Sequence, residues 1–511
     1  MTSHYNVLVV GGGGAGCVLA RRLAERCPTA SVALLEAGGD GRRSPFQDPD
    51  LTSVFQTWAP ESNWQLQTVP QTGLEERRIP LTQGKVLGGG TSVNAMMYVR
   101  GDSAVLEEWQ QLSGGHPAWS PARYLAMYRA LECCLGDGFD PVIRGDAGPI
   151  QIRHTPNPSL SSLAFLDAAV QCGFQRDDFN GLQQLDVAGL MQLNLEADGL
   201  RCSMARAFLH EPLPANLSLH CGAEVRTLLL EGERLVGVRL LDDRVLQADQ
   251  VVVAAGAFLT PALLMASGIG DPDLLAKASI PCHVENRHVG KNLSDHMRAM
   301  VAYRSPADPG RPEFLCESAL FSRSGLQPGR EPDIQINFSA GVDGFIPPEF
   351  LPTPAPAHTV IFVPVLVRPQ SKGSVFPLGP RLEDGFGIDP AYLTHPTDLD
   401  VYVKAVEVVR QLAASSAMAP YCAEELSPGA LEPGSYLRRY AQTIWHPVGS
   451  CAMGGDAATS ACTPEFRLRG VSNGFVVDAS VLPTLPSGNP QAAIFAMAAI
   501  AADTIGDALN A

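Results

Sequence analysis

The chain has 511 residues, of which 45% are hydrophobic and 18% are charged, a composition typical of a globular protein with a large buried core. Its 37 basic and 53 acidic residues give a formal net charge of −16, and Lys and Arg never cluster beyond pairs. A nucleic acid or an anionic membrane surface is therefore not expected as a partner.

Neither a targeting segment nor a membrane span is expected. Only residues 1–4 precede the first predicted strand, too few for a signal peptide. The alanine-rich segment 491–502 is too short to cross a bilayer, so we expect a cytoplasmic protein without a transmembrane segment. The 12 cysteines include no C-x-x-C pair, and His283, His288 and His296 are not spaced as metal ligands. Reduced thiols and no bound metal are the expectation.

The first glycine-rich stretch has the pattern of a dinucleotide-binding unit. Residues 7–10 are apolar without alternation, as in a strand buried on both faces. Gly11, Gly13 and Gly16 then fill the glycine positions of G-x-G-x-x-G. At these positions the chain must turn tightly, approach a pyrophosphate and let a helix pack against the strand.

A helix and a second strand complete this unit. The apolar stripe of residues 15–26 predicts an amphipathic helix whose N-terminus would face the phosphates. Residues 31–35 predict a strand, and Glu36 ends it 20 residues after Gly16, where an acid meets a ribose hydroxyl in such units. A glycine-rich turn of another α/β protein would leave Glu36 unexplained. We therefore interpret the stretch as a dinucleotide site.

A second glycine-rich loop lies in residues 84–101. Its three glycines, 88–90, precede Thr91 and Ser92, which places free backbone N–H groups beside a ligand. The loop at 344–358 is either a lid over an entrance or a surface connection. Other segments predict helices at 105–112, 121–135, 161–172 and 399–414, a β-hairpin at 223–230 and 236–241, strands at 251–255, 319–322, 333–338, 360–367 and 475–477, and a loop at 37–80.

Three further stretches complete a family pattern. The segments 84–101, 256–270 and 289–296 resemble the signatures of the GMC (glucose–methanol–choline) oxidoreductases, a family of FAD enzymes, and the resemblance covers nearly the whole chain. It favours the choline dehydrogenase-like and hydroxymethylfurfural oxidase-like branch. The implied fold is α/β, with an FAD-binding Rossmann-like (GxGxxG) domain and a second, antiparallel-sheet substrate-binding domain. The implied segments are 1–155, 201–298 and 441–511 for FAD, 299–440 for substrate, and 156–200 as substrate domain or connection.

The resemblance and the glycine motif together imply a set of FAD contacts. They are Gly11, Gly13, Gly14, Ala15, Gly16, Glu36, Ala37, Gly88, Gly89, Thr91, Asn94, Ala95, Met96, Val225, Ala255, Gly256, Trp445, Asp478, Ala479, Asn489, Pro490 and Gln491. Some family members attach FAD covalently through a histidine at the position of Val93. Because valine cannot form that bond, we expect FAD to be bound non-covalently.

The C-terminal segment carries the implied catalytic pair. His446 follows Trp445 in a Gly/Ser-rich turn and matches the family's catalytic base, and Asn489 matches the second active-site position. A neutral imidazole can take a hydroxyl proton, and an amide can donate a hydrogen bond to the developing alkoxide. We expect a kinetic pKa near or above the unperturbed 6.5 or so for His446. His296 is interpreted as structural, and Cys451 as a core thiol.

The expected reaction is oxidation of a primary alcohol or hydrated aldehyde, with oxygen or another electron acceptor. A lyase or light-driven decarboxylase on the same fold is the alternative, and a redox-inactive FAD scaffold is a third possibility. Phe338 and Trp445 suggest a pocket that tolerates aromatic substrates, whereas no acid is identified that would pair with a quaternary ammonium.

Overall fold

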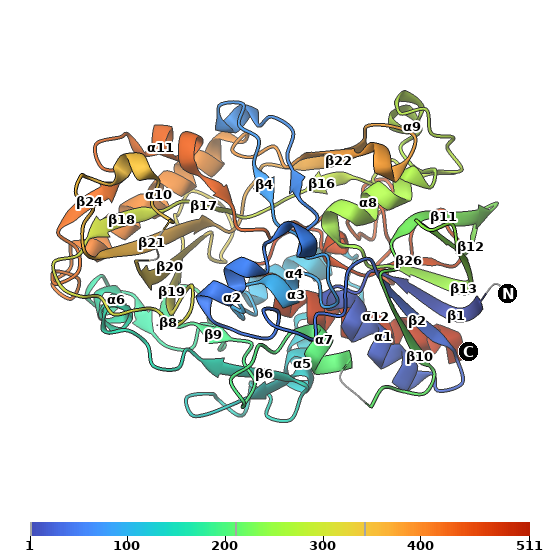
Figure 1. Cartoon of the computed structure of the whole chain (residues 1–511), viewed down its shortest axis with the longest axis horizontal. Helices are drawn as coiled ribbons and strands as arrows, with labels where there is room; N and C mark the ends of the chain where they lie inside the picture. The colour runs from blue at the N-terminus through green and yellow to red at the C-terminus, as the bar shows by residue number, and fades with distance from the viewer. Residues whose placement is uncertain (1–2, 210–211, 342–343, 511) are drawn as a thin grey trace.

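The computed structural model describes residues 3–209, 212–341 and 344–510 and contains two large sheets at opposite ends of its long axis (Figure 1). The first sheet is mostly parallel and is followed by an antiparallel hairpin. In order it consists of β10 (Leu217–Cys221), β2 (Val32–Glu36), β1 (Ser3–Val10), β13 (Val245–Val253), β12 (Arg234–Leu240) and β11 (Val225–Glu231), with β26 (Gly474–Val476) also paired to β13.

The register of this sheet brings the glycine motif and Glu36 to one edge. Val10, the last residue of β1, lies beside Leu35 on β2 and beside Val253 on β13. The three strands run parallel, so the residues that follow them meet at the same carboxyl edge. Helix α1 (Gly14–Arg26) begins directly after β1 and packs against α12 (Gln491–Asn510). The predicted strand–helix–strand unit is therefore confirmed.

The second sheet is largely antiparallel, and helices cover only one of its faces. Its main path is β24 (Glu424–Ser427), β18 (Val301–Arg304), β21 (Thr359–Leu366), β20 (Ile334–Ala340), β19 (Ser318–Ser322), β8 (Val187–Leu190) and β7 (Gln175–Arg176), with β17 (Met297–Arg298) and β25 (Gln442–Thr443) joined to it. Helices α10 (Pro396–Ala413) and α6 (Leu160–Gln171) pack on β20 and its neighbours. The predicted α/β class with a second, antiparallel sheet is confirmed.

Strand β20 alternates strictly between its two faces. Ile334, Ile336 and Phe338 belong to the apolar core formed with α6 and α10, so the polar residues between them face the other side. The expectation that Phe338 lines the pocket is wrong, because its side chain stacks on Phe165 of α6 at 5.1 Å between ring centroids.

Shorter elements connect the sheets. They are α2 (Leu51–Gln56), α3 (Gly90–Val93), α4 (Ser103–Leu112), α5 (Pro121–Leu131), α7 (Met204–Leu209), α8 (Gly256–Ala266), α9 (Pro272–Lys277), α11 (Pro433–Tyr440), β3 (Leu66–Gln67), β4 (Pro80–Leu81), β5 (Glu132–Cys134), β6 (Ile150–His154), β9 (Gln192–Leu193), β14 (Ile269–Gly270), β15 (Val284–Glu285), β16 (Lys291–Leu293), β22 (Gly373–Pro377) and β23 (Phe386–Asp389).

Two predicted elements have different bounds in the structure. The predicted loop 37–80 contains α2 and the pair β3–β4, and the predicted helix 121–135 stops at Leu131 because Glu132 enters the ladder with β6.

The alanine-rich segment 491–502, expected to be too short to cross a bilayer, is part of the longer helix α12, which ends at Asn510 and is long and apolar enough to cross a membrane. However, 67% of its apolar window is buried inside the protein, and it packs against α1.

A buried ion cluster fixes the end of the second glycine-rich loop. The Glu132 carboxylate accepts from Arg100 Nε at 2.7 Å, from Arg144 Nε at 3.0 Å and from the Tyr98 hydroxyl at 2.9 Å. Burial by itself would raise the pKa of Glu132, but the two guanidinium groups outweigh it and hold the pKa below its usual value. Because Tyr98 and Arg100 belong to segment 84–101, the cluster ties this loop to β5.

We expect Glu132→Gln to destabilise the fold by about 3–5 kcal/mol, because the buried Arg100 would lose its counter-charge and Arg144 would keep only Asp178. The folded-state pKa of Glu132 is lowered, so its stabilisation is present above the unfolded pKa and is lost as the pH falls through the folded one. Thermal unfolding of wild type and variant from pH 7 down to pH 3 measures both the loss of stability and its dependence on pH. Glu407→Gln, at an exposed ion pair on α10, is the control and should change little. Equal losses in the two variants would contradict the role of the cluster.

Candidate active site

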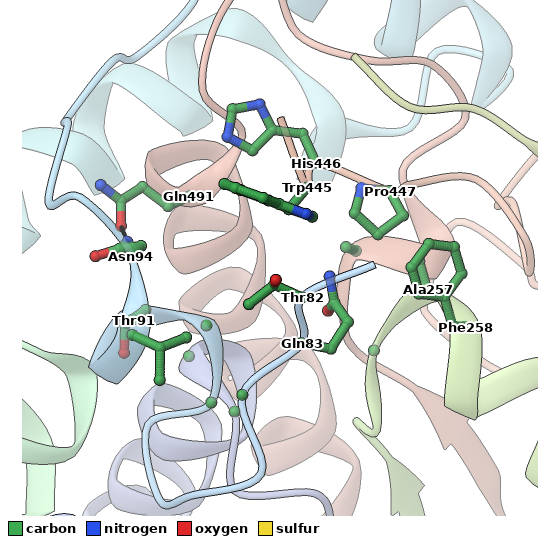
Figure 2. Close-up of a pocket in the computed structure, with 18 of the residues that line it drawn as sticks. Thr82, Gln83, Thr91, Asn94, Ala257, Phe258, Trp445, His446, Pro447 and Gln491 are labelled. Carbon is green, nitrogen blue, oxygen red and sulfur yellow. Dashed lines mark hydrogen bonds between the residues drawn. The ribbon is translucent and has the colours of Figure 1, made fainter. Parts of the chain in front are cut away.

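One pocket runs from the carboxyl edge of the first sheet to the inner face of the second sheet. At one end it is lined by residues after β1, β2 and β13, such as Gly11, Glu36 and Ala255. At the other end it is lined by β20 and β21, through residues such as Asn337 and Val363. Figure 2 shows its middle, where His446 and Trp445 lie across from Thr91 and Asn94.

The dinucleotide end is built from backbone N–H groups and one buried acid. Glu36 accepts from the N–H of Gly12 at 3.0 Å and of Gly38 at 2.8 Å, and burial raises its pKa despite these bonds. Helix α1 has Gly13 as its N-cap residue, with no side-chain cap and no acid in its first turn. Its N-terminus is therefore available to an anion such as a pyrophosphate.

Two kinds of glycine line or support this end. A Cβ on Gly11 would lie 2.3 Å from the Ala254 carbonyl oxygen, and one on Gly16 would lie 2.0 Å from the Gly11 carbonyl oxygen, so the fold itself requires both. A Cβ on Gly13 or Gly90 would meet no protein atom within 4 Å, and neither residue has a positive φ. These two glycines leave room that only a ligand could use, and the cradle fits a dinucleotide.

Most of the expected cofactor residues line the pocket. These are Gly11, Gly13, Gly14, Ala15, Glu36, Ala37, Gly89, Thr91, Asn94, Ala95, Val225, Ala255, Gly256, Trp445, Asp478, Ala479, Asn489, Pro490 and Gln491. Gly16, Gly88 and Met96 do not line it. Gly16 packs against the Gly11 carbonyl, Gly88 donates its N–H to the Gly12 carbonyl at 2.7 Å, and Met96 belongs to a separate apolar cluster.

A hydrogen-bond network orients Asn94 beside α12. Its amide nitrogen donates to Gln491 Oε1 at 3.0 Å, a contact drawn in Figure 2, and its Oδ1 accepts from Arg201 at 2.9 Å. Arg201 is almost fully buried, and burial lowers its pKa to about 10. The sequence did not single out Arg201, because no motif marks it.

The reacting end contains two histidines in direct contact. His296 Nε2 lies 2.8 Å from the Val367 carbonyl oxygen, and the two Nδ1 atoms of His296 and His446 lie 3.0 Å apart. A carbonyl only accepts, so His296 Nε2 carries the proton, and burial keeps this ring neutral by lowering its pKa to about 3. His296 Nδ1 is then an acceptor, and His446 Nδ1–H must donate to it.

The hydrogen bonds from the Val367 carbonyl through His296 fix the tautomer of His446. With its proton on Nδ1, the neutral ring of His446 has its lone pair on Nε2. The Asn489 amide nitrogen donates to that Nε2 at 3.3 Å, and the Asn489 oxygen accepts from Gln335 at 3.3 Å. His446 Nε2 therefore faces the pocket as a proton acceptor beside an amide donor. His296, which the sequence suggested was structural, is in contact with the predicted base.

The backbone at Trp445 and His446 is strained and held from both sides. Trp445 has a φ of +63°, which is unfavourable for a bulky residue. Its N–H donates to the Thr443 hydroxyl at 2.7 Å, and the N–H of His446 donates to Asp295 at 2.8 Å. Asp295 also accepts from Tyr392 at 2.5 Å, and burial raises its pKa to about 6. These bonds set the direction in which the imidazole projects.

The structure reverses the expected pKa shift of His446. Burial, with a smaller contribution from His296, lowers the pKa of His446 well below its ordinary value. The sequence-based expectation of a pKa near or above 6.5 is therefore wrong. The physical reason is burial of a ring that no carboxylate contacts among the described residues, since Asp295 bonds the backbone N–H of His446 instead. The ring is neutral throughout the neutral pH range.

Aromatic and polar walls close the reacting end. Trp58 lies 5.0 Å from Trp445 between ring centroids, and Phe345, from the loop 344–358, lines the same space. Asn337, Ser339 and the Arg298 side chain also line it, and the sequence did not identify them. The alternation of the β20 sequence, IQINFSA, is the signal that could have found the first two.

Comparison with known proteins places the chain in a family. The GMC oxidoreductase family models match residues 5–298 and 369–498. The chain is 34% identical to human mitochondrial choline dehydrogenase (98% of this chain, 90% of the relative) and 31% identical to pyridoxine 4-oxidase of Microbacterium luteolum (97% and 98%). The crystal structure of pyridoxine 4-oxidase from Mesorbium loti superposes with a TM-score of 0.89 at 31% identity, covering 98% of each chain. The chain belongs to the GMC oxidoreductase family, a class of FAD-dependent enzymes that act on CH–OH groups.

A matched pair of glycine variants tests the cradle. Gly13→Ala should fold with near-normal stability and retain FAD at least about 10-fold less tightly, because its methyl group enters the ligand space. Gly16→Ala should instead lower the stability of the apoprotein by about 1–3 kcal/mol, because its methyl group meets a backbone carbonyl. Flavin per polypeptide and apoprotein melting temperature measure the two effects. Normal flavin retention by Gly13→Ala would contradict the cradle.

Proposed function

We propose that the protein oxidises a primary alcohol, or a hydrated aldehyde, to the corresponding carbonyl compound, with His446 as the base that removes the hydroxyl proton. The observation that carries this proposal is the hydrogen-bond chain from Val367 through His296, which makes His446 Nε2 a proton acceptor in the pocket, beside the Asn489 amide. The choline and pyridoxine enzymes named above support the reaction class.

The site residues divide the work of the reaction. A bound alcohol would donate its hydroxyl proton to His446 Nε2, and the Asn489 N–H would donate to the same oxygen as negative charge develops on it. Gln335 holds the Asn489 oxygen and so keeps its NH₂ group directed at the reacting position. Aromatic side chains around this point limit access of water. FAD, when bound, supplies the hydride acceptor.

FAD would lie along the pocket from the first sheet to His446. We propose that Glu36 holds the adenosine ribose, that the N-terminus of α1 holds the pyrophosphate, and that the 88–94 loop and Gly256 flank the flavin. The division into FAD segments 1–155, 201–298 and 441–511 and substrate segments 156–200 and 299–440 is part of this proposal. The pairing of β8 with β19 supports placing 156–200 with the substrate domain.

The cofactor should be bound without a covalent link. Val93 is buried in α3 and lines the pocket, and an aliphatic side chain cannot bond to flavin. Acid precipitation of the purified holoenzyme should leave all the flavin in the supernatant, which absorbance measures directly. Flavin that stays with the precipitated protein would contradict this prediction.

His446 and Asn489 should respond differently to substitution. His446→Ala should slow anaerobic flavin reduction by an alcohol by on the order of 10²- to 10⁴-fold, because proton abstraction is lost. Asn489→Ala should slow it by on the order of 10²-fold, as for one lost oxyanion donor. The pKa of His446 is lowered, so the wild-type rate should be constant from about pH 6.5 upward and should decrease only at lower pH, as His446 takes up a proton.

Stopped-flow absorbance measures the rate of flavin reduction across this pH range. Cys451→Ser, at a buried thiol outside the pocket lining, is the control. Near-normal reduction by the His446→Ala enzyme would refute the assignment. Bleaching of the flavin by an alcohol without air separates oxidation from the lyase and decarboxylase alternatives. Parallel assays with oxygen and with a dye acceptor separate an oxidase from a dehydrogenase.

A further inference from the structure

A guanidinium group lies in the pocket beside the aromatic walls. Arg298 is the last residue of β17 and lines the pocket. Its guanidinium carbon lies 5.3 Å from the centroid of the Trp445 ring and 5.8 Å from that of Phe345. Nε donates to the Thr443 carbonyl at 3.2 Å, and Nη1 lies 3.9 Å from the Met300 sulfur. A guanidinium has five N–H groups, so most of its donor capacity is unused.

Arg298 has no carboxylate partner among the residues that the structure describes. Three acids among the residues that the structure describes line the pocket, and each is engaged at the dinucleotide end: Glu36 with backbone N–H groups, Glu224 with Lys85 at 2.8 Å, and Asp478 with Gly256 N–H at 2.9 Å. Burial lowers the pKa of Arg298 to about 10, so the group is still charged at neutral pH. A buried, unpaired cation is costly unless a ligand pairs with it.

Two further polar atoms at this end have no partner. The Ser339 hydroxyl oxygen and the Trp445 Nε1 are buried and make no hydrogen bond within the described part of the chain. Ser339 is 4% exposed, and both residues line the pocket. Trp445 Nε1 can only donate, and a hydroxyl can donate as well. Ser339 and Trp445 therefore add hydrogen-bond donors to the lining of the same pocket as Arg298, as an anionic group requires.

The sheet places this cation apart from the reacting position. Arg298 pairs with Val365 on β21, and Val365 pairs with Gln335 on β20, the residue that contacts Asn489. Two strand spacings separate Arg298 from Gln335, roughly 10 Å between backbones. Arg298 lines the pocket, and Gln335 acts on the reacting position through Asn489. A flat spacer about the size of one aromatic ring would therefore bridge the gap between the aromatic walls.

We propose that this site takes an alcohol that also carries a carboxylate, with Arg298 binding the carboxylate across an aromatic or similarly flat spacer from the CH–OH carbon. The planar fork of a guanidinium matches a carboxylate, and the aromatic rings match the spacer. A quaternary ammonium alcohol such as choline would meet a cation here and should bind poorly. This proposal rests on the proposed alcohol oxidation for its substrate, but its recognition step can be measured separately.

The test uses the holoenzyme and two alcohols of the same shape, 4-(hydroxymethyl)benzoate and its neutral amide, 4-(hydroxymethyl)benzamide. Anaerobic flavin reduction gives the half-saturation concentration for each. Wild type should prefer the carboxylate by about 10- to 100-fold, and Arg298→Gln should lose this preference while its value for the amide changes less than about 3-fold. Arg298→Lys should retain part of the preference. Arg304→Gln, at an exposed ion pair on β18, is the matched control and should behave as wild type.

Binding of the non-reacting pair 4-methylbenzoate and 4-methylbenzamide, followed by flavin absorbance, separates recognition from chemistry. If no alcohol reduces the flavin but 4-methylbenzoate binds in an Arg298-dependent way, the proposed oxidation fails and the recognition proposal stands. If the alcohols react but wild type shows no preference for the carboxylate, or if Arg298→Gln keeps that preference, the recognition proposal is overturned. Melting temperatures of the variants show that each is folded.

Discussion

The hydrogen bond from His296 Nε2 to the Val367 carbonyl is the contact on which the reacting end depends. A backbone carbonyl cannot donate, so this single bond assigns every proton along the chain from His296 to His446. The result is an imidazole whose Nε2 lone pair faces the pocket, and no carboxylate among the described residues contacts its ring. A carboxylate there would raise the pKa of His446 and bring its titration into the neutral range, whereas burial, with a smaller contribution from His296, lowers that pKa and keeps the ring neutral and able to accept a proton.

Asp295 orients His446 through its backbone N–H. Its buried carboxylate holds the N–H of His446 and the hydroxyls of Thr443 and Tyr392, and so stabilises the left-handed conformation of Trp445 next to it. The acid therefore acts on the direction of the imidazole and not on its charge. Strain of this kind persists only where the surroundings determine the backbone completely, and here the contacts come from three separate segments of the chain, at Asp295, Tyr392 and Thr443.

The pocket joins two surfaces with opposite electrostatic character. At the first sheet, every acid is satisfied by backbone N–H groups or by a lysine, which leaves the N-terminus of α1 free for an anion. At the second sheet, one guanidinium and two polar atoms without a hydrogen-bond partner in the described part of the chain belong to residues that line the pocket beside the aromatic walls. Choline dehydrogenase acts by its name on a cationic alcohol, whereas the recognition proposed for Arg298 would favour an anionic one.

The sequence by itself determined the dinucleotide unit, the α/β class and the family, because glycine spacing, buried strands and the Trp-His motif are local patterns that survive without knowledge of the fold. It also marked His446 and Asn489 through their motifs. Only the tertiary structure decided which face of β20 meets the pocket, that Phe338 points away from it, and that His296 touches His446, because these depend on pairing between strands far apart in the chain. The direction of the His446 pKa shift belongs to the same group. It follows from burial and from one neighbouring neutral ring, and neither can be read from residues 440–450 alone.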